Sequence, residues 1–375
     1  MAESKTKALV LSGGGSRGAY ECGAWQAMQE LGMEFHMILG TSVGALNGVM
    51  FIQADPVDSA NLWRSLETQM IFDVEADAKM HNFAWEFITG GGAGTSGLQK
   101  IIAGFIDEEK VRKSPVDLGI VTVEFPSRTP HYLWKDDIPE GRLSDYITAS
   151  ASAFPALKTF RIDGREYIDG GYADNMPIKM AVEHGATHVT AVFLDAFGQV
   201  HPDDFNLPDE LTIIESHWDL GDFLVFDRRN TRKIMRLGYL DTMKTYGIFD
   251  GFWYSFAKGQ WNRKNLRSAD ITAKIFEMDP LILYTRESFL TRLQEKILES
   301  ADEVRRITEE PFELKPERIK GLMDTVNRKT LVLAIADSIR KKKDDRGPIR
   351  SLLKDEIRAA EFILENGLLP ENGDK

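Results

Sequence analysis

The chain has 375 residues, of which 43% are hydrophobic and 28% are charged, a composition typical of a folded globular protein rather than a disordered one. Its formal net charge of −12 argues against nucleic-acid binding, because such proteins carry a basic surface. The single cysteine, Cys22, excludes an intrachain disulfide and a cysteine-rich zinc site.

The first predicted elements alternate between strand and helix. Residues 7–12 (KALVLS) form a short apolar run that ends at three glycines, which predicts a buried strand. Small and apolar residues then recur at helical spacing over 19–31. A second buried strand is predicted at 37–39, before the turn 40–44 and a helix over about 43–53. This order and spacing indicate a mainly parallel α/β sheet.

One apolar stretch needs to be distinguished from a membrane-spanning helix. Residues 35–54 contain no Asp, Glu, Lys or Arg and are long enough to cross a bilayer. Glycines and polar residues interrupt the stretch, so we interpret it as the buried strand, turn and helix. The N-terminal segment lacks a signal-peptide pattern, because its apolar run at 8–11 is too short. The sequence therefore predicts a cytoplasmic protein and leaves open whether it is peripheral at membranes.

Residues 55–97 interrupt the alternation of strands and helices. This segment holds several tryptophans and phenylalanines, followed by the glycine-rich run 90–94. Two interpretations stay open, namely a lid with a glycine hinge or a helical insertion packed on the core.

The sheet is predicted to resume downstream of this segment. A helix is expected at 143–152, and strand patterns lie at 117–125, 132–134, 166–168 and 187–194. The character of the chain changes after about residue 200, and from Pro280 to the end it is charged and helical in period, without an internal repeat. We therefore expect a three-layer α/β/α domain over 5–200 and a mainly helical region over 201–375.

The pentapeptide Gly40-Thr41-Ser42-Val43-Gly44 has the pattern G-x-S-x-G and lies between a predicted strand and a predicted helix. This is the context of a nucleophile elbow, in which a tight turn holds a serine in a strained, exposed conformation. The small residues Gly40 and Gly44 let the strand and helix pass closely. The helix N-terminus adds positive partial charge near the serine oxygen. We predict that Ser42 is a nucleophile.

A second glycine-rich stretch, Gly13-Gly14-Gly15-Ser16-Arg17-Gly18, follows the first predicted strand. It formally matches the dinucleotide fingerprint G-x-G-x-x-G. That fingerprint also requires an acidic residue at the end of the second strand, and none occurs between His36 and Ala54. The alternative is that backbone N–H groups of the loop stabilise an oxyanion. Because both loops leave the carboxyl edge of a parallel sheet, this loop and Ser42 are expected to face each other.

The serine also needs a base. Histidine is the usual partner, but no candidate lies in an obvious catalytic turn: His81, His131, His184, His188, His201 and His217. Asp169-Gly170-Gly171 follows a strand-like segment, and the two glycines allow a sharp turn that presents a carboxylate at the sheet edge. Burial raises the proton affinity of a carboxylate, which makes Asp169 a candidate base.

Taken together, the motifs resemble those of the patatin-like phospholipases. The pattern of that family consists of a glycine-rich loop with Arg or Lys, a G-x-S-x-G elbow, a helix ending in Ala-Ser-x-x-Pro and an Asp-Gly-Gly turn. This chain has the same motifs in the same order at 13–18, 40–44, 151–155 and 169–171. The segment Asn175-Met176-Pro177-Ile178 is similar to the one that follows the turn in the family.

The resemblance covers about residues 5–200 and implies a patatin-like catalytic domain there. It implies a Ser–Asp dyad in which Ser42 attacks a lipid ester and Asp169 accepts the serine proton. The implied oxyanion loop consists of Gly13, Gly14, Gly15, Arg17 and Gly18, while Gly40 and Gly44 shape the elbow and Gly170 and Gly171 the Asp turn. An acyl-enzyme intermediate, a lipid or phospholipid substrate, and the lack of a metal or other cofactor are also implied.

Three other functions stay open on the sequence alone. They are a Ser-His-Asp esterase, a nucleotide-dependent oxidoreductase, and a non-catalytic lipid-binding protein that retains the fold. A nucleic-acid partner is not expected, and nothing in the sequence sets the oligomeric state.

Overall fold

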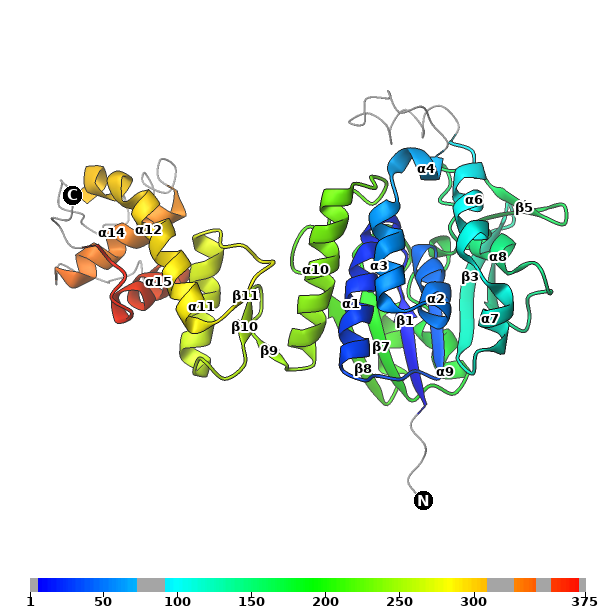
Figure 1. Cartoon of the computed structure of the whole chain (residues 1–375), viewed down its shortest axis with the longest axis horizontal. Helices are drawn as coiled ribbons and strands as arrows, with labels where there is room; N and C mark the ends of the chain where they lie inside the picture. The colour runs from blue at the N-terminus through cyan, green and yellow to red at the C-terminus, as the bar shows by residue number, and fades with distance from the viewer. Residues whose placement is uncertain (1–5, 73–91, 309–326, 342–351, 371–375) are drawn as a thin grey trace, which may run out of the picture. The chain divides into compact units, whose positions relative to one another are not determined.

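The computed structural model of the protein describes residues 6–72, 92–308, 327–341 and 352–370. The chain divides into two compact units, Met1–Thr242 and Met243–Lys375. Figure 1 labels the helices and strands of both units.

The first unit is built on a mixed sheet with the strand order β5-β6-β3-β2-β1-β7-β8, in which β4 also pairs with β3. Five strands run parallel: β1 (Lys7–Leu11), β2 (Met37–Thr41), β3 (Asp117–Phe125), β7 (His188–Phe193) and β8 (Glu210–Glu215). The antiparallel strands are β4 (Thr129–Trp134), β5 (Phe160–Ile162) and β6 (Arg165–Asp169).

Helices cover both faces of this sheet. They are α1 (Ala19–Glu30), α2 (Val43–Gln53), α3 (Pro56–Ser65), α4 (Thr68–Phe72), α6 (Ser96–Phe105), α7 (Glu108–Lys113), α8 (Leu143–Ser150), α9 (Ile178–Glu183) and α10 (Arg228–Thr245). The described part of the unit also contains the short 3-10 helices η1 (Gly15–Gly18), η3 (Gly170–Tyr172) and η4 (Pro202–Asn206).

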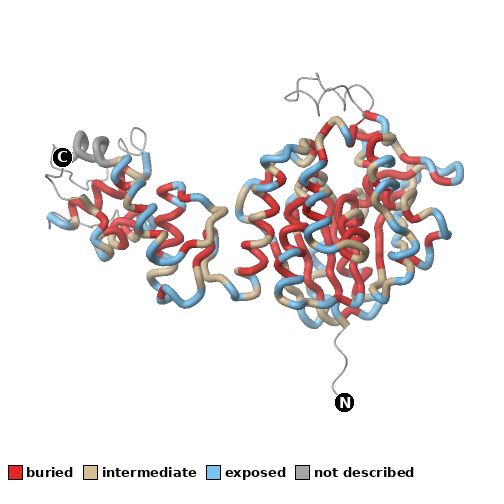
Figure 2. The backbone as a smooth tube through the Cα atoms, viewed as in Figure 1, coloured by how far each residue is buried: buried red, intermediate tan, exposed pale blue. Residues whose placement is uncertain are grey.

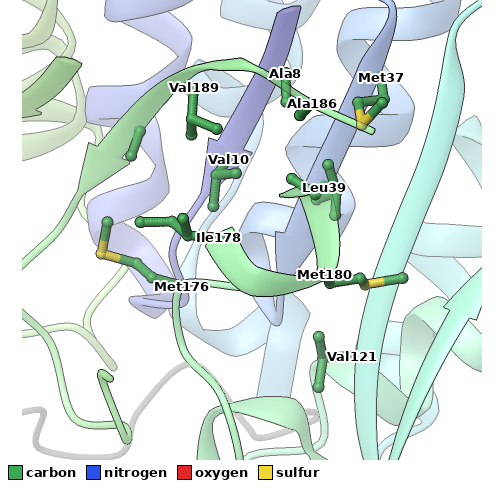
Figure 3. Packing of buried hydrophobic residues seen from close by; sticks show 12 residues of the cluster. Ala8, Val10, Met37, Leu39, Val121, Met176, Ile178, Met180, Ala186 and Val189 are labelled. Atoms are coloured by element: carbon green, nitrogen blue, oxygen red, sulfur yellow. The ribbon is translucent and has the colours of Figure 1, made fainter. Parts of the chain in front are cut away.

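The burial of β1 shows why its sequence is apolar from Ala8 to Leu11. Every residue from 8 to 11 is fully buried, because each face of the strand has its own helical layer (Figure 2). On one face α2 packs so closely that a Cβ added to Gly48 would lie 3.3 Å from Ile38. On the other face Ile178 of α9 packs in one cluster with Val10 (Figure 3). The predicted three-layer α/β/α fold with a mainly parallel sheet is confirmed.

The first unit extends beyond residue 200, where the sequence analysis placed its end. There β8 adds a parallel strand beside β7, and α10 packs against α1. A Cβ on Gly23 would lie 1.8 Å from the Met235 carbonyl oxygen, and a Cβ on Gly238 would lie 2.0 Å from that of Tyr20. Local sequence patterns do not reveal such contacts, because the partners are far apart in the chain.

The segment 55–97 contains described helices at each end. Asp55 caps α3 by accepting hydrogen bonds from the N–H groups of Val57 and Asp58, and Pro56 occupies the first turn. Residues 73–91, which form the middle of the predicted lid or insertion, lie outside the described residues. Among the helices that the structure describes, none has the length and apolar character of a membrane span.

The second unit is mainly helical, as expected for this part of the chain. Its helices are α11 (Arg263–Ile275), α12 (Arg286–Thr308), α14 (Arg328–Arg340) and α15 (Lys354–Glu365). It also contains a small sheet that the sequence analysis did not predict, formed by β9 (Phe249–Asp250), β10 (Ser255–Ala257) and β11 (Leu283–Tyr284). Phe256 lies in the core of this unit, where its ring contacts Trp261 and Phe289.

The close approach of α1 and α10 leads to a stability prediction. We expect Gly238→Ala to lower the free energy of unfolding by about 1–3 kcal/mol, because the new methyl group overlaps the Tyr20 carbonyl oxygen. Urea denaturation measures the change.

Gly104 of α6 provides a matched control, since an added Cβ there meets nothing within 4 Å. Gly104→Ala is expected to raise the free energy of unfolding by about 0.5 kcal/mol, because alanine restricts the unfolded chain and favours the helix. Equal effects of the two substitutions would contradict the proposed tight helix contact.

Candidate active site

The site forms where two strands meet end to end along one edge of β3. Strand β2 pairs with the first half of β3 up to the pair Thr41–Val121, and β6 pairs with the second half from the pair Thr122–Asp169. The opposite edge of β3 pairs with β4 across both regions, so β2 and β6 share the remaining edge. Because β6 is antiparallel to β3, its last residue Asp169 arrives beside the last residues of β2. The register thereby brings Asp169 next to Ser42.

Ser42 occupies the sharp turn between β2 and α2. Its φ of 57° and ψ of −123° place a non-glycine residue in a rarely populated backbone region, which costs about 1–3 kcal/mol. The Ser42 N–H donates to Ser150 Oγ at 2.9 Å, and Ser150 Oγ donates to the Val121 carbonyl at 2.6 Å. Ser150 at the end of α8 therefore holds the strained turn against β3. The sequence analysis gave Ser150 no role.

The two elbow glycines are required by the close approach of β2, α2 and β1. A Cβ on Gly40 would lie 2.2 Å from the Gly44 carbonyl, and a Cβ on Gly44 would lie 2.2 Å from the Leu11 carbonyl oxygen. Any larger residue at either position would force the backbone of the turn to move. The structure thus has the strand–turn–helix context that the G-x-S-x-G pattern needs.

Asp169 is a buried carboxylate with a raised pKa. Burial raises its pKa to about 6, against the lowering effect of hydrogen bonds from the Ser42 side chain and the Gly171 N–H. The Gly171 N–H lies 2.8 Å from Asp169 Oδ1, and the Asp169 N–H donates to the Ser152 carbonyl at 2.9 Å. A Cβ on Gly170 would lie 2.1 Å from the Val121 carbonyl oxygen, so only glycine fits there.

The glycine-rich loop at 13–15 lines one cavity together with Ser42 and Asp169. Asn175 holds this loop in place. Asn175 Oδ1 accepts the Gly13 N–H at 3.0 Å, and Asn175 Nδ2 donates to the Gly13 carbonyl at 3.3 Å. The Asn175 N–H donates to the Gln199 carbonyl, and the Gln199 N–H donates to the Gly171 carbonyl. One buried asparagine thereby connects the glycine loop with the Asp169 turn.

Arg17 and Gly18 have structural contacts rather than a place in the cavity wall. The Arg17 Nε donates to the Gly221 carbonyl at 2.9 Å, and Nη1 donates to the carbonyls of Leu194 and Asp195. Gly18 packs against α2, where a Cβ would lie 2.5 Å from Val43. Neither residue lines the cavity, and the Arg17 guanidinium binds backbone carbonyls of neighbouring loops, so their place in the oxyanion loop stays a prediction.

A buried polar network lies behind the glycine loop. Glu21 is fully buried, and burial raises its pKa well above the usual range despite hydrogen bonds from Asn47 and the Ser12 N–H. Asn47 Nδ2 donates to Glu21 Oε2 at 2.7 Å and to the Gly18 carbonyl at 2.9 Å. Asn47 Oδ1 accepts the Trp63 Nε1–H at 2.9 Å. The network joins η1, α1, α2 and α3, and the sequence analysis missed it.

A cavity of about 320 Å³ opens beside Ser42 and Asp169. Apolar side chains from α2, α3, α4 and α6 line it: Leu46, Met50, Leu62, Trp63, Ile71, Phe72, Leu98, Ile101, Ile102 and Phe105. Phe223, Leu224 and Phe226 contribute a further wall from beyond residue 200, in a region to which the sequence analysis assigned no motif. The cavity combines a serine–carboxylate pair with a mainly apolar surface.

None of the histidines that the structure describes lines this cavity. His131 lies 3.3 Å from Glu124, and His188 lies 3.2 Å from Glu210. His201 Nε2 lies 2.9 Å from the Ala173 carbonyl oxygen. His81 lies outside the described residues.

Comparison with known proteins places this geometry in a family. Residues 9–182 match the family model described as patatin-like phospholipase. This part of the chain is a patatin-like phospholipase domain. The match contains Ser42 and Asp169, together with the glycine loop at 13–15.

Curated relatives carry a similar domain within much longer chains. Lysophospholipase NTE1 of Scheffersomyces stipitis is 28% identical over 198 residues, which is 49% of this chain and 11% of the relative. Neuropathy target esterase sws of Drosophila melanogaster is 28% identical over 216 residues, which is 54% of this chain and 14% of the relative. Among solved structures, VipD from Legionella pneumophila has 13% identity and a TM-score of 0.43, with 99% of this chain and 93% of VipD covered.

The contacts of Asn175 predict that this residue positions the patatin glycine loop. We expect Asn175→Asp to lower the rate at which Ser42 reacts with a fluorophosphonate probe by about 100-fold, because the new carboxylate repels the Gly13 carbonyl that it faces. Asn206→Asp makes the same chemical change at an exposed position of η4 and serves as the control. Unchanged labelling of a folded Asn175→Asp variant would contradict the positioning role.

Proposed function

We propose that the chain hydrolyses acyl esters of lipids, with Ser42 as the nucleophile and Asp169 as its base. The observation that carries this proposal is that the sheet register places Ser42 beside Asp169, a buried carboxylate whose pKa is raised to about 6 and which interacts with the Ser42 side chain. A base is most effective when its pKa lies near the working pH, and an ordinary surface aspartate is far too acidic. The strained turn at Ser42 and the apolar cavity beside it support the same function.

The reaction has two steps, which are acylation of Ser42 and hydrolysis of the acyl-enzyme. Ser42 Oγ attacks the ester carbonyl while its proton passes to Asp169, and collapse of the tetrahedral intermediate releases the alcohol, which takes the proton from Asp169. The acyl group is then attached to Ser42. A water molecule attacks this ester as Asp169 takes its proton, and the fatty acid leaves while Ser42 regains the proton.

The glycine loop supplies the donors for the oxyanion. The Gly13 N–H already bonds to Asn175, whereas the structure gives the N–H groups of Gly14 and Gly15 no acceptor among the described residues. Both residues line the cavity with Ser42. We therefore assign the oxyanion to these two amides, each of which contributes about 3–4 kcal/mol in comparable acyl transfers.

The cavity wall indicates the substrate class. An apolar cavity next to the nucleophile stabilises a fatty acyl chain by removing its methylene groups from water. The relatives named as a lysophospholipase and an esterase are consistent with a phospholipid or lysophospholipid ester. Because the chain spans only 11–14% of the length of these two relatives, the substrates of the whole relatives are not transferred to it.

A Ser-His-Asp esterase is the main enzymatic alternative. It would need a histidine beside Ser42, and the described histidines contact other groups away from the cavity. A non-catalytic lipid-binding role would leave no reason to keep the strained φ of Ser42.

Covalent labelling tests the nucleophile and the base. A fluorophosphonate probe is expected to label the parent chain and to leave Ser42→Ala unlabelled. We expect Asp169→Asn to reduce the labelling rate by about 10³-fold or more, because an amide cannot accept the serine proton. Ser65→Ala and Asp136→Asn change the same chemical groups at exposed positions and are expected to label normally. Equal labelling of Ser42→Ala and the parent would contradict the assignment of Ser42 as the nucleophile.

The pH dependence of hydrolysis provides a separate test. Only the ionised form of Asp169 accepts a proton, so kcat/KM for a soluble ester is expected to be constant well above about pH 6 and to fall tenfold per pH unit below it. The profile is measured in the parent and in single His→Ala variants. An inflection that disappears in one histidine variant would assign the base to that histidine instead.

A further inference from the structure

Exposed aromatic side chains surround the mouth of the cavity. Phe197 is 73% exposed and Phe154 is 37% exposed, yet both also line the cavity with Ser42. Tyr172 lies between them, with its ring 5.8 Å from that of Phe197 and its hydroxyl donating to the Phe154 carbonyl. We call Phe154, Tyr172 and Phe197 the aromatic rim. Large side chains at this exposure leave apolar surface in contact with water.

The exposed position of Phe197 is fixed by the backbone around it. Asp195 has a φ of 45°, and its carbonyl accepts a hydrogen bond from Arg17. Gly198 has a φ of 153°, and a Cβ there would lie 2.6 Å from the Asn175 side chain. One end of the loop is thus held by Arg17, and the other end packs against Asn175. The loop presents Phe197 outward in a defined place beside the cavity mouth.

The chain as a whole has a net charge of −12, but the exposed Arg128 lies near Tyr172 of the aromatic rim. Arg128 and Lys158 are exposed, and neither forms an ion pair with another described residue. Burial and Asp169 raise the pKa of the Tyr172 phenol, and the nearby positive charge of Arg128 acts in the opposite direction. Asp195 is the exposed acid on the Phe197 loop.

We propose that the aromatic rim docks onto the surface of a phospholipid aggregate with anionic head groups, so that the cavity mouth opens directly onto the lipid. This inference rests on the proposed function, because a lipid ester must leave such an aggregate to reach Ser42. The apolar surface of the rim is continuous with the cavity wall through Phe154 and Phe197. Tyrosine and phenylalanine favour the boundary between acyl chains and head groups, and basic residues favour an anionic surface.

Vesicle binding by a chain that cannot turn over the lipid tests the proposal. In the Ser42→Ala background, sedimentation with vesicles of phosphatidylcholine and phosphatidylglycerol measures the partition coefficient. We expect Phe197→Ala to lower it about tenfold, because one benzyl group no longer enters the lipid. Phe252→Ala removes the same group from a 54% exposed position in the second unit and is expected to leave binding unchanged.

Arg128 tests the electrostatic part with the same assay. Arg128→Gln is expected to lower binding about fivefold on vesicles that contain phosphatidylglycerol and to have no effect on pure phosphatidylcholine. The proposal is overturned if the parent does not bind vesicles, if Phe197→Ala binds as the parent does, or if Phe252→Ala loses binding instead. If the aromatic rim binds a protein partner instead, the parent will not bind vesicles. Fluorophosphonate labelling of chains that keep Ser42, in the absence of lipid, tests the proposed function separately. Normal labelling together with lost vesicle binding would overturn this inference alone.

Discussion

The site depends on one constraint of the sheet, which is that β2 and β6 share a single edge of β3 and end where they meet. The pairs Thr41–Val121 and Thr122–Asp169 are adjacent along β3, so the register of each strand sets the position of its last side chain. A slip of one residue in either strand would turn its terminal side chain to the other face of the sheet. The burial of both faces of the sheet opposes such a slip, because each side chain would then have to fit into a different, closely packed helical layer. The core therefore fixes the relative position of a serine and a carboxylate that are far apart in the sequence.

Three residues near this junction have conformations or buried charges that lower the stability of the fold. Ser42 holds a strained φ, Asp169 is a carboxylate in an apolar cavity, and Glu21 is fully buried with Oε1 lacking a partner among the described residues. Hydrogen bonds from neighbouring elements hold Ser42 and Glu21, whereas the Asp169 carboxylate also accepts the Gly171 N–H of its own turn. Ser150 supports the Ser42 turn, and Asn175 supports the glycine loop. The local strain is tolerable because the sheet and its helical layers supply the stability elsewhere.

Sequence patterns were informative where the signal is local. The apolar run before Gly13, the G-x-S-x-G turn at Ser42 and the glycines after Asp169 each depend on neighbouring residues, and the predicted sheet and layers followed from them. The missed features depend on distant contacts. The antiparallel direction of β6, the cavity wall at Phe223 and the packing of α10 on α1 all involve partners separated by much of the chain. The contacts of the Arg17 side chain could not be predicted for the same reason, since its carbonyl partners belong to loops near residues 195 and 221.

The pKa of Asp169 depends on a balance between burial, which raises it, and hydrogen bonding, which lowers it. In the proposed mechanism, this balance makes Asp169 an effective base. Complete desolvation without hydrogen bonds would keep the carboxyl group protonated and unable to accept a proton at neutral pH. A denser set of donors would stabilise the carboxylate and return it to the weak basicity of a surface aspartate. Asp169 has a limited set, with the Gly171 N–H and the Ser42 side chain opposing burial, and its pKa is held near 6. A direct hydrogen bond to the serine then makes an intervening imidazole unnecessary, because the carboxylate is both ionised at neutral pH and basic enough to take the proton.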